Sequence, residues 1–193
     1  MQLIFIRHGK PEIVGGDNDP ALSAVARSQA GRLAAFIARE RIGRVVSSPL
    51  LRARETAEPT SRILGIEAEI VDGFAEADRF GSGYRGIDDL RRDPVAWPKF
   101  MADPIGFCGG DPVAFTRAVL DAVQDLFMRG LDQKLAVFTH GLPINIVLSH
   151  ALGLERITYF VPHYCSITRV NGSSLRDMTI TSVNETAHLD TGA

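Results

Sequence analysis

Two histidine–glycine pairs stand directly after short apolar runs in this sequence. His8-Gly9 follows the run LIFIR, and His140-Gly141 follows the run LAVFT. A glycine at such a junction allows the backbone to turn sharply or to approach a ligand closely. Imidazole can act as a nucleophile and can carry a proton near neutral pH. Both histidines are therefore candidates for chemistry on a bound substrate.

Two arginines accompany these histidines. Arg7 immediately precedes His8, and Arg52 lies shortly after a third apolar run, RVVSS. A guanidinium group binds phosphate oxygens in a bidentate manner, and a helix N-terminus adds backbone amide donors. Two arginines and two imidazoles would suit a compact dianion, for which phosphate is the natural candidate.

These residues need a scaffold that brings distant segments together. Short apolar runs alternate with helical patterns, which predicts an α/β domain with a mainly parallel sheet. In such sheets ligands bind at the carboxyl ends of the strands. We expect strands at 3–6, 44–47, 68–71, 135–138, 167–170 and 178–183, and helices at 23–41, 48–64, 112–128 and 143–152, with Ser23 and Ser48 as N-caps.

Residues 72–110 form the least regular part of the sequence. Glycines and prolines interrupt this segment at short intervals, although some helix is expected around 87–101. Long irregular segments on a compact domain often serve as lids or binding loops. We therefore expect one domain over residues 1–193, with an insertion over the active site at about 72–110.

Composition restricts the class of protein. The chain has 193 residues, of which 45% are hydrophobic and 23% charged, with a net charge of −2. These values are typical of a globular domain. The net charge gives no extended positive potential that would attract nucleic acid or an anionic membrane surface. The N-terminal apolar run is too short for a signal peptide, and no run approaches the roughly 20 residues of a membrane span. Without zinc-type spacing, Cys108 and Cys165 are expected to be reduced thiols of a cytoplasmic protein.

Three ordered motifs resemble the histidine phosphatase superfamily, the phosphoglycerate-mutase-like group. They are IFIRHG, SSPLLRARETA and VFTHG, and the resemblance extends from residue 3 to residue 189. It implies a three-layer α/β/α sandwich. It also implies that His8 attacks phosphorus, that Arg7 and Arg52 clamp the phosphate, and that His140 completes the pocket with the neighbouring Gly9 and Gly141. Glu76, in GFAEADRFG, is similar to the family's carboxylic acid that protonates the leaving oxygen.

The resemblance leads us to expect a metal-independent phosphatase that works through phospho-His8 and needs no cofactor. Its partner would be a small phosphorylated substrate or phosphate, and the sequence leaves a homodimer open. The alternatives are a phosphomutase, a phosphoprotein or phosphohistidine phosphatase, and a silent phosphate-binding regulatory protein. Mutases of the family are generally longer, which favours hydrolysis. Asp78 is an alternative acid to Glu76, and a zinc site is disfavoured by the nearby arginines.

Overall fold

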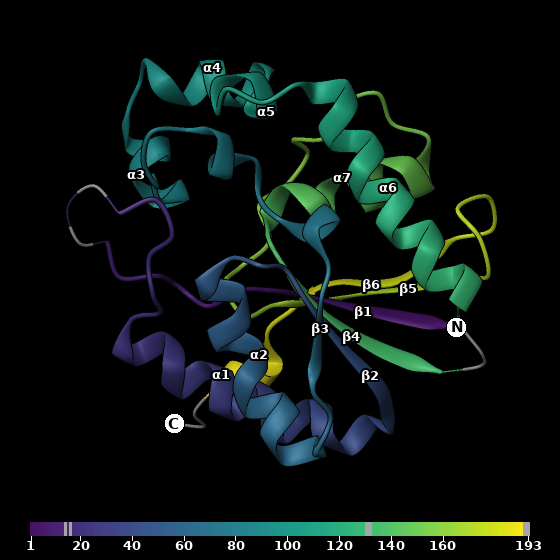
Figure 1. Cartoon of the computed structure of the whole chain (residues 1–193). Coiled ribbons are helices and arrows are strands. Elements are labelled where there is room, and N and C mark those ends of the chain that lie inside the picture. Colours follow the sequence, from purple (N-terminus) through teal and green to yellow (C-terminus); the bar gives the residue numbers. More distant parts are fainter. Residues whose placement is uncertain (14, 16, 130–132, 191–193) are drawn as a thin grey trace.

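A six-stranded mixed sheet forms the middle layer of the protein (Figure 1). The computed structural model describes all residues except 14, 16, 130–132 and 191–193. The strand order is β3-β2-β4-β1-β5-β6. The strands are β1 (Gln2–Arg7), β2 (Ile42–Ser47), β3 (Ala68–Ile70), β4 (Lys134–Thr139), β5 (Ile167–Asn171) and β6 (Thr179–Glu185).

The four strands from β3 to β1 are parallel, as expected, but the sheet as a whole is mixed. β5 pairs with β1 in an antiparallel manner, and β6 is antiparallel to β5. The amide of Cys165, just before β5, donates to the carbonyl of Arg7 at the end of β1. The chain has therefore returned to the carboxyl ends of the parallel strands before β5 begins, so β5 must run in the opposite direction.

Helices cover both faces of the sheet. α1 (Ala24–Ile37) and α2 (Leu51–Leu64) lie on one face, and α6 (Pro112–Arg129) and α7 (Gly141–Leu152) lie on the other (Figure 1). Successive side chains of a strand point to opposite faces. Accordingly, Ile4 belongs to a buried cluster with residues of α1 and α2, whereas Phe5 belongs to a second cluster with residues of α6 and α7. This arrangement gives the expected three layers.

Several of the expected helix boundaries differ from the structure, and α1 ends at Ile37 and not at Arg41. Ser23 caps α1 as predicted, but the N-cap of α2 is Leu50 and not Ser48. The Ser48 hydroxyl instead accepts from the Leu50 amide and contacts a histidine of the site. α7 begins at Gly141, two residues before Pro143. A proline in the first turn is compatible with a helix because the first amides have no intrahelical partner.

Residues 72–110 form short helices and turns near the carboxyl ends of the parallel strands (Figure 1). Asp93 divides the helix expected at 87–101 in two, because its side chain accepts from the amides of Val95 and Ala96. The elements are α3 (Ile87–Arg92), α4 (Ala96–Ala102) and α5 (Pro104–Phe107), with 3₁₀ turns at Asp72–Phe74 and Ala77–Phe80. Further 3₁₀ turns lie at Ala38–Glu40 and Ala187–Leu189. Among the residues described, no helix has the length and apolar character to cross a membrane.

Candidate active site

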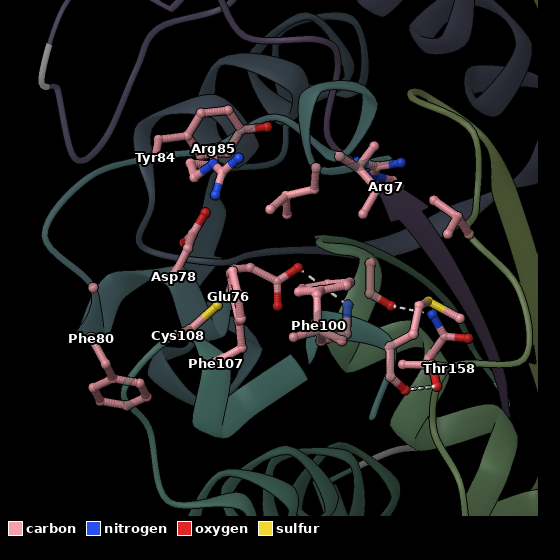
Figure 2. Close-up of a pocket in the computed structure, with 18 of the residues that line it drawn as sticks. Arg7, Glu76, Asp78, Phe80, Tyr84, Arg85, Phe100, Phe107, Cys108 and Thr158 are labelled. Atoms are coloured by element: carbon pink, nitrogen blue, oxygen red, sulfur yellow. Dashed lines mark hydrogen bonds between the residues drawn. The ribbon is translucent and has the colours of Figure 1, made fainter. Parts of the chain in front are cut away.

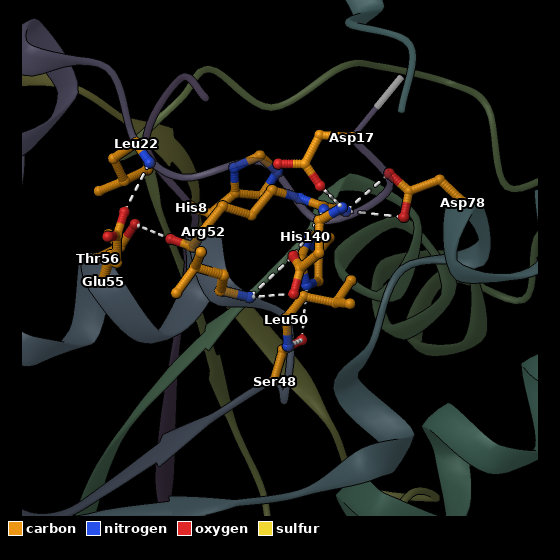
Figure 3. A network of polar contacts seen from close by, with 12 residues as sticks. His8, Asp17, Leu22, Ser48, Leu50, Arg52, Glu55, Thr56, Asp78 and His140 are labelled. Carbon is orange, nitrogen blue, oxygen red and sulfur yellow. Dashed lines mark hydrogen bonds and ion pairs between the residues drawn. The ribbon is translucent and has the colours of Figure 1, made fainter. Parts of the chain in front are cut away.

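The ends of three adjacent strands bring the predicted site residues together. β4 lies between β1 and β2, and Arg7 is in register with Thr139. The amide of His8 donates to the carbonyl of Thr139 at 2.9 Å, and the amide of Ser48 donates to that of Phe138 at 2.9 Å. As a result, the ring centroids of His8 and His140 are only 4.9 Å apart, with Arg52 beside them (Figure 3).

The surroundings of His8 favour a neutral ring with one free nitrogen. Its Nδ1 lies 2.7 Å from the carbonyl oxygen of Gly9. A carbonyl only accepts hydrogen bonds, so we assign the proton to Nδ1, which leaves the Nε2 lone pair free. Burial lowers the pKa of His8 well below its ordinary value, and the charges of Arg52 and Arg7 lower it further. His8 is therefore prepared to act as a nucleophile at neutral pH.

His140 is fully buried beside His8. Its Nε2 lies 2.7 Å from the Ser48 hydroxyl oxygen, whereas its Nδ1 has no hydrogen-bond partner among the residues described. Burial lowers the pKa of His140 well below its ordinary value, and Arg52, His8 and Arg7 act in the same direction. One nitrogen of a neutral His140 thus remains available for a hydrogen bond with a bound oxyanion.

Both arginines are buried against tyrosine rings. The Arg7 guanidinium carbon lies 3.9 Å from the ring centroid of Tyr164, and Arg7 also donates to the carbonyl of Pro162. The Arg52 guanidinium carbon lies 4.8 Å from the ring centroid of Tyr84. A cation above an aromatic face is attracted to it, and the ring also restricts its position. The tyrosines therefore hold the two guanidinium groups in place.

Arg52 is engaged by carboxylates from two different loops. Its Nη2 donates to both oxygens of Asp78, at 2.8 and 2.7 Å (Figure 3). Its Nη1 lies 3.5 Å from Asp19. Its Nε and Nη1 nevertheless make no hydrogen bond within the described part of the chain. Since buried polar groups are nearly always satisfied, these spare donors point to an anionic ligand.

Glu76 lies at the N-terminus of α7. Its carboxylate accepts from the amides of Ala77 at 3.0 Å and Leu142 at 3.2 Å. Burial raises the pKa of Glu76 to about 7, and the nearby charge of Asp78 contributes to this rise. A carboxyl group with this pKa can donate and accept a proton near neutral pH.

Several of these groups open onto one cavity of about 410 Å³. Arg7, His8, Arg52, Glu76 and Gly141 line it, whereas His140 and Gly9 do not. Figure 2 shows Glu76 and Asp78 at the wall that residues 76–109 contribute. Across the described residues, no three His, Cys, Asp or Glu side chains are grouped so that they could hold a metal ion.

The comparison with family models decides the classification. The model of the histidine phosphatase superfamily (branch 1) matches residues 3–186. The chain belongs to the histidine phosphatase superfamily. The matched range includes every predicted site residue from Arg7 to Gly141. The residues that the superfamily motifs contain are therefore the residues that the fold brings together.

Relatives within the superfamily carry several functional names. A bifunctional protein of Mycobacterium tuberculosis is 30% identical over 161 residues, which are 78% of this chain but only 44% of that protein. This chain thus spans less than half of that relative's length. A probable phosphoglycerate mutase of Photorhabdus laumondii is 26% identical over 213 residues, covering 100% of this chain and 97% of the mutase. The crystal structure of a phosphoserine phosphatase from Entamoeba histolytica, in complex with 3-phosphoglyceric acid, is 25% identical, with a TM-score of 0.78 and coverage of 97% and 98%.

The glycines of the two superfamily motifs have different surroundings. The amide of Gly9 donates to the Thr56 hydroxyl at 2.9 Å and is therefore not free for a phosphate oxygen. A Cβ at Gly9 would lie 3.0 Å from Cβ of Ala26, so close packing requires this glycine. Gly141 is the first residue of α7 and lines the cavity, with room for a Cβ 3.8 Å from Glu76. Direct contact with phosphate is thus expected of Gly141 and not of Gly9.

Sequence analysis missed the contacts of Tyr84, Tyr164 and Asp19 with the arginines. All three residues lie in loops, and none belongs to a periodic pattern or a recognised motif. Asp78 was considered only as a proton donor, although it binds Arg52. Its spacing of two residues from Glu76 was the only signal in the sequence.

Proposed function

We propose that the protein is a phosphatase that hydrolyses phosphate monoesters through a phosphohistidine at Nε2 of His8. One observation carries this proposal: the hydrogen bond between Nδ1 of His8 and the Gly9 carbonyl leaves Nε2 unprotonated beside two buried arginines. The phosphoserine phosphatase with the same fold supports the hydrolytic reading.

The anion site would consist of Arg7, Arg52 and His140, with the first backbone amide of α7 at Gly141. Arg7 and Arg52 would stabilise the charge on the phosphoryl oxygens, the main catalytic contribution in phosphoryl transfer. The free Nδ1 of His140 and the spare donors of Arg52 supply the hydrogen bonds that these oxygens require. A phosphate at this site would compete with Asp78 for Arg52.

The reaction would proceed in two steps. In the first, Nε2 of His8 attacks phosphorus, the ester P–O bond breaks, and the leaving oxygen takes the proton of Glu76. In the second, water attacks the phosphorus of phospho-His8, the P–N bond breaks, and the Glu76 carboxylate takes the proton of the water. The products are an alcohol and phosphate, and both side chains return to their initial states.

Replacement of the acid, Glu76→Gln, is expected to slow alkyl phosphates more than aryl phosphates. An alkoxide needs a proton to leave, whereas a phenolate leaves with little assistance, and general acid catalysis contributes roughly 10²- to 10⁴-fold. Glutamine keeps one oxygen for the Leu142 amide but loses the acceptor of the Ala77 amide, so thermal unfolding should check that the variant stays folded. Steady-state kcat/KM for butyl phosphate and 4-nitrophenyl phosphate measures the difference. Equal slowing of both esters would move the acid role to another residue.

Replacement of its neighbour, Asp78→Asn, is expected to change the pH dependence of the first step. Because protonated Glu76 donates the proton, kcat/KM for an alkyl phosphate should fall above about pH 7 in the wild type. The variant loses the negative charge that raises the pKa of Glu76 and releases Arg52, which lowers it. The alkaline limb should therefore move to lower pH. If kcat/KM declined at the same pH as in the wild type, or at a higher pH, Glu76 would not control this decline.

The direct test of the proposal is hydrolysis of 4-nitrophenyl phosphate in the presence of excess chelator. We expect turnover without added metal and a phosphorylated protein after rapid denaturation at alkaline pH. Mass spectrometry should place this phosphoryl group on His8. Activity that needs a divalent metal ion, or phosphate bound to a different residue, would refute the mechanism.

A phosphoglycerate mutase is the second candidate, because a probable mutase is similar over the full length of this chain. A mutase returns the phosphoryl group to a second hydroxyl of the product, so phosphoglycerate would isomerise without net release of phosphate. Phosphorus NMR of an incubation with 3-phosphoglycerate distinguishes the two reactions. The proposal of hydrolysis requires free phosphate to be the dominant product.

A further inference from the structure

The cavity extends well beyond the anion site. Arg7, His8 and Arg52 line one end, but a phosphate group would fill only a small part of about 410 Å³. The remaining walls come mainly from residues 80–109 and from 142–162, after β4. This space is continuous with the anion site, so it would receive the group attached to the phosphate.

Apolar side chains dominate these remaining walls. Phe100 is only 9% exposed, and its ring meets that of Phe107 edge to face at a centroid distance of 5.8 Å (Figure 2). Leu90 and Leu142, which also line the cavity, are 4% and 6% exposed. Burial and nearby carboxylates raise the pKa of the Cys108 thiol to about 12, so this group is neutral as well. The walls are therefore largely apolar.

The cations beside these walls already have acidic partners. Arg85, which lines the cavity, pairs with Asp93 at 3.1 Å. Lys10, in a smaller pocket that shares Tyr84, pairs with Asp88 at 3.1 Å. A second anionic group would therefore have to displace an acidic partner from either of these cations.

Two buried polar side chains of the far wall already donate hydrogen bonds within the protein. The Thr158 hydroxyl donates to the Met101 carbonyl, and the Asn145 amide nitrogen donates to the carbonyls of Gly141 and Phe160. A carboxylate on the leaving group would meet apolar rings and the acidic Glu76 and Asp78. Burial of such an unpaired charge is strongly unfavourable.

We infer that the substrate is a phosphate monoester of an uncharged, apolar alcohol, with an aromatic or extended alkyl group seated against Phe100 and Phe107. The inference rests on the proposed phosphatase function and specifies the substrate class of the same site. It disfavours substrates that carry a carboxylate near the phosphate, such as 3-phosphoglycerate and phosphoserine.

A homologous series of n-alkyl phosphates tests the inference without changing the leaving-group chemistry. From ethyl to hexyl phosphate we expect kcat/KM to increase roughly two- to fourfold per methylene, as buried methylenes leave water. 3-Phosphoglycerate and phosphoserine should be hydrolysed more slowly than butyl phosphate. A flat series, or a preference for the carboxylated esters, would overturn the inference even if phospho-His8 forms.

A substitution of a phenylalanine in the cavity wall provides a second test of the inference. Phe107→Asn should reduce the gain per methylene, so that kcat/KM falls more for hexyl phosphate than for ethyl phosphate. The matched control is Phe36→Asn on α1, whose ring stacks on His188 outside the cavity and which should retain the full gain. Equal slopes in wild type and Phe107→Asn would exclude this ring from the site.

The same series separates failure of the inference from failure of the proposed function. If no ester is hydrolysed and no phospho-His8 forms, the phosphatase proposal fails. In that case, calorimetry of alkyl phosphate binding still tests whether the cavity prefers apolar groups. Tighter binding of hexyl than of ethyl phosphate would uphold the apolar site, and equal binding would reject it.

Discussion

Replacement of the nucleophile, His8→Ala, is expected to lower kcat for phosphate monoesters by at least about 10³-fold. Alanine has no nitrogen for attack on phosphorus, and no other described imidazole offers a free Nε2 at the cavity, because that of His140 lies 2.7 Å from Ser48. The acid-labile phosphoryl group on the protein should disappear together with turnover. Phosphate release measured with wild type and variant at equal concentration provides the comparison.

The control for His8→Ala is His150→Ala on α7. His150 is exposed and its Nε2 lies 3.2 Å from the Leu175 carbonyl, remote from the proposed chemistry. Its replacement should leave kcat near the wild-type value. Because His8 is buried, thermal unfolding of each variant must show that the fold persists. A folded His8→Ala protein that retained wild-type turnover would be incompatible with a phosphohistidine at this position.

Removal of the buried guanidinium, Arg52→Ala, is expected to weaken vanadate binding by about 2–5 kcal/mol, or roughly 30- to 4,000-fold. Arg52 is fully buried, and its spare donors would bind the phosphoryl oxygens. Inhibition of aryl phosphate hydrolysis by vanadate, together with calorimetry, measures the loss. Arg52→Lys keeps the charge but lacks the planar fork, so an intermediate loss is expected.

Arg54→Ala is a matched control for Arg52→Ala on the same helix. Arg54 is exposed and lies two residues further along α2, so its replacement should leave vanadate affinity nearly unchanged. The comparison also resolves a choice that rested only on the superfamily motif. If Arg54→Ala caused the larger loss, the assignment of the anion site to Arg52 would be wrong.

The sequence predicted which groups could perform the chemistry because each stands at a local signal. His8 and His140 end apolar runs, Arg52 begins an amphipathic helix, and Glu76 belongs to a recognisable motif. The parallel strands β1, β2 and β4 could also be predicted, since each contains a short continuous apolar run, which is a local property. The description of residues 1–193 as one domain with an insertion over the active site at 72–110 stays a prediction.

Other features depended on contacts between distant segments. The antiparallel β5 follows from the return of the chain to the carboxyl ends before Cys165, which no period in the sequence indicates. The N-cap of α2 was misplaced because Ser48 contacts His140, a residue 92 positions away. The apolar walls of the cavity likewise combine short segments whose composition alone shows no common surface.

By itself, the sequence determined which side chains are candidates for the chemistry, their places at the ends of strands and the family of the protein. Only the tertiary structure decided that β4 lies between β1 and β2, that Asp78 and two tyrosines hold the arginines, and that the anion site continues into an apolar cavity. The physical reason is the range of the interactions. Propensity and hydrophobic period act over a few neighbouring residues, whereas strand order, ion pairs between loops and cavity walls arise when remote segments pack together.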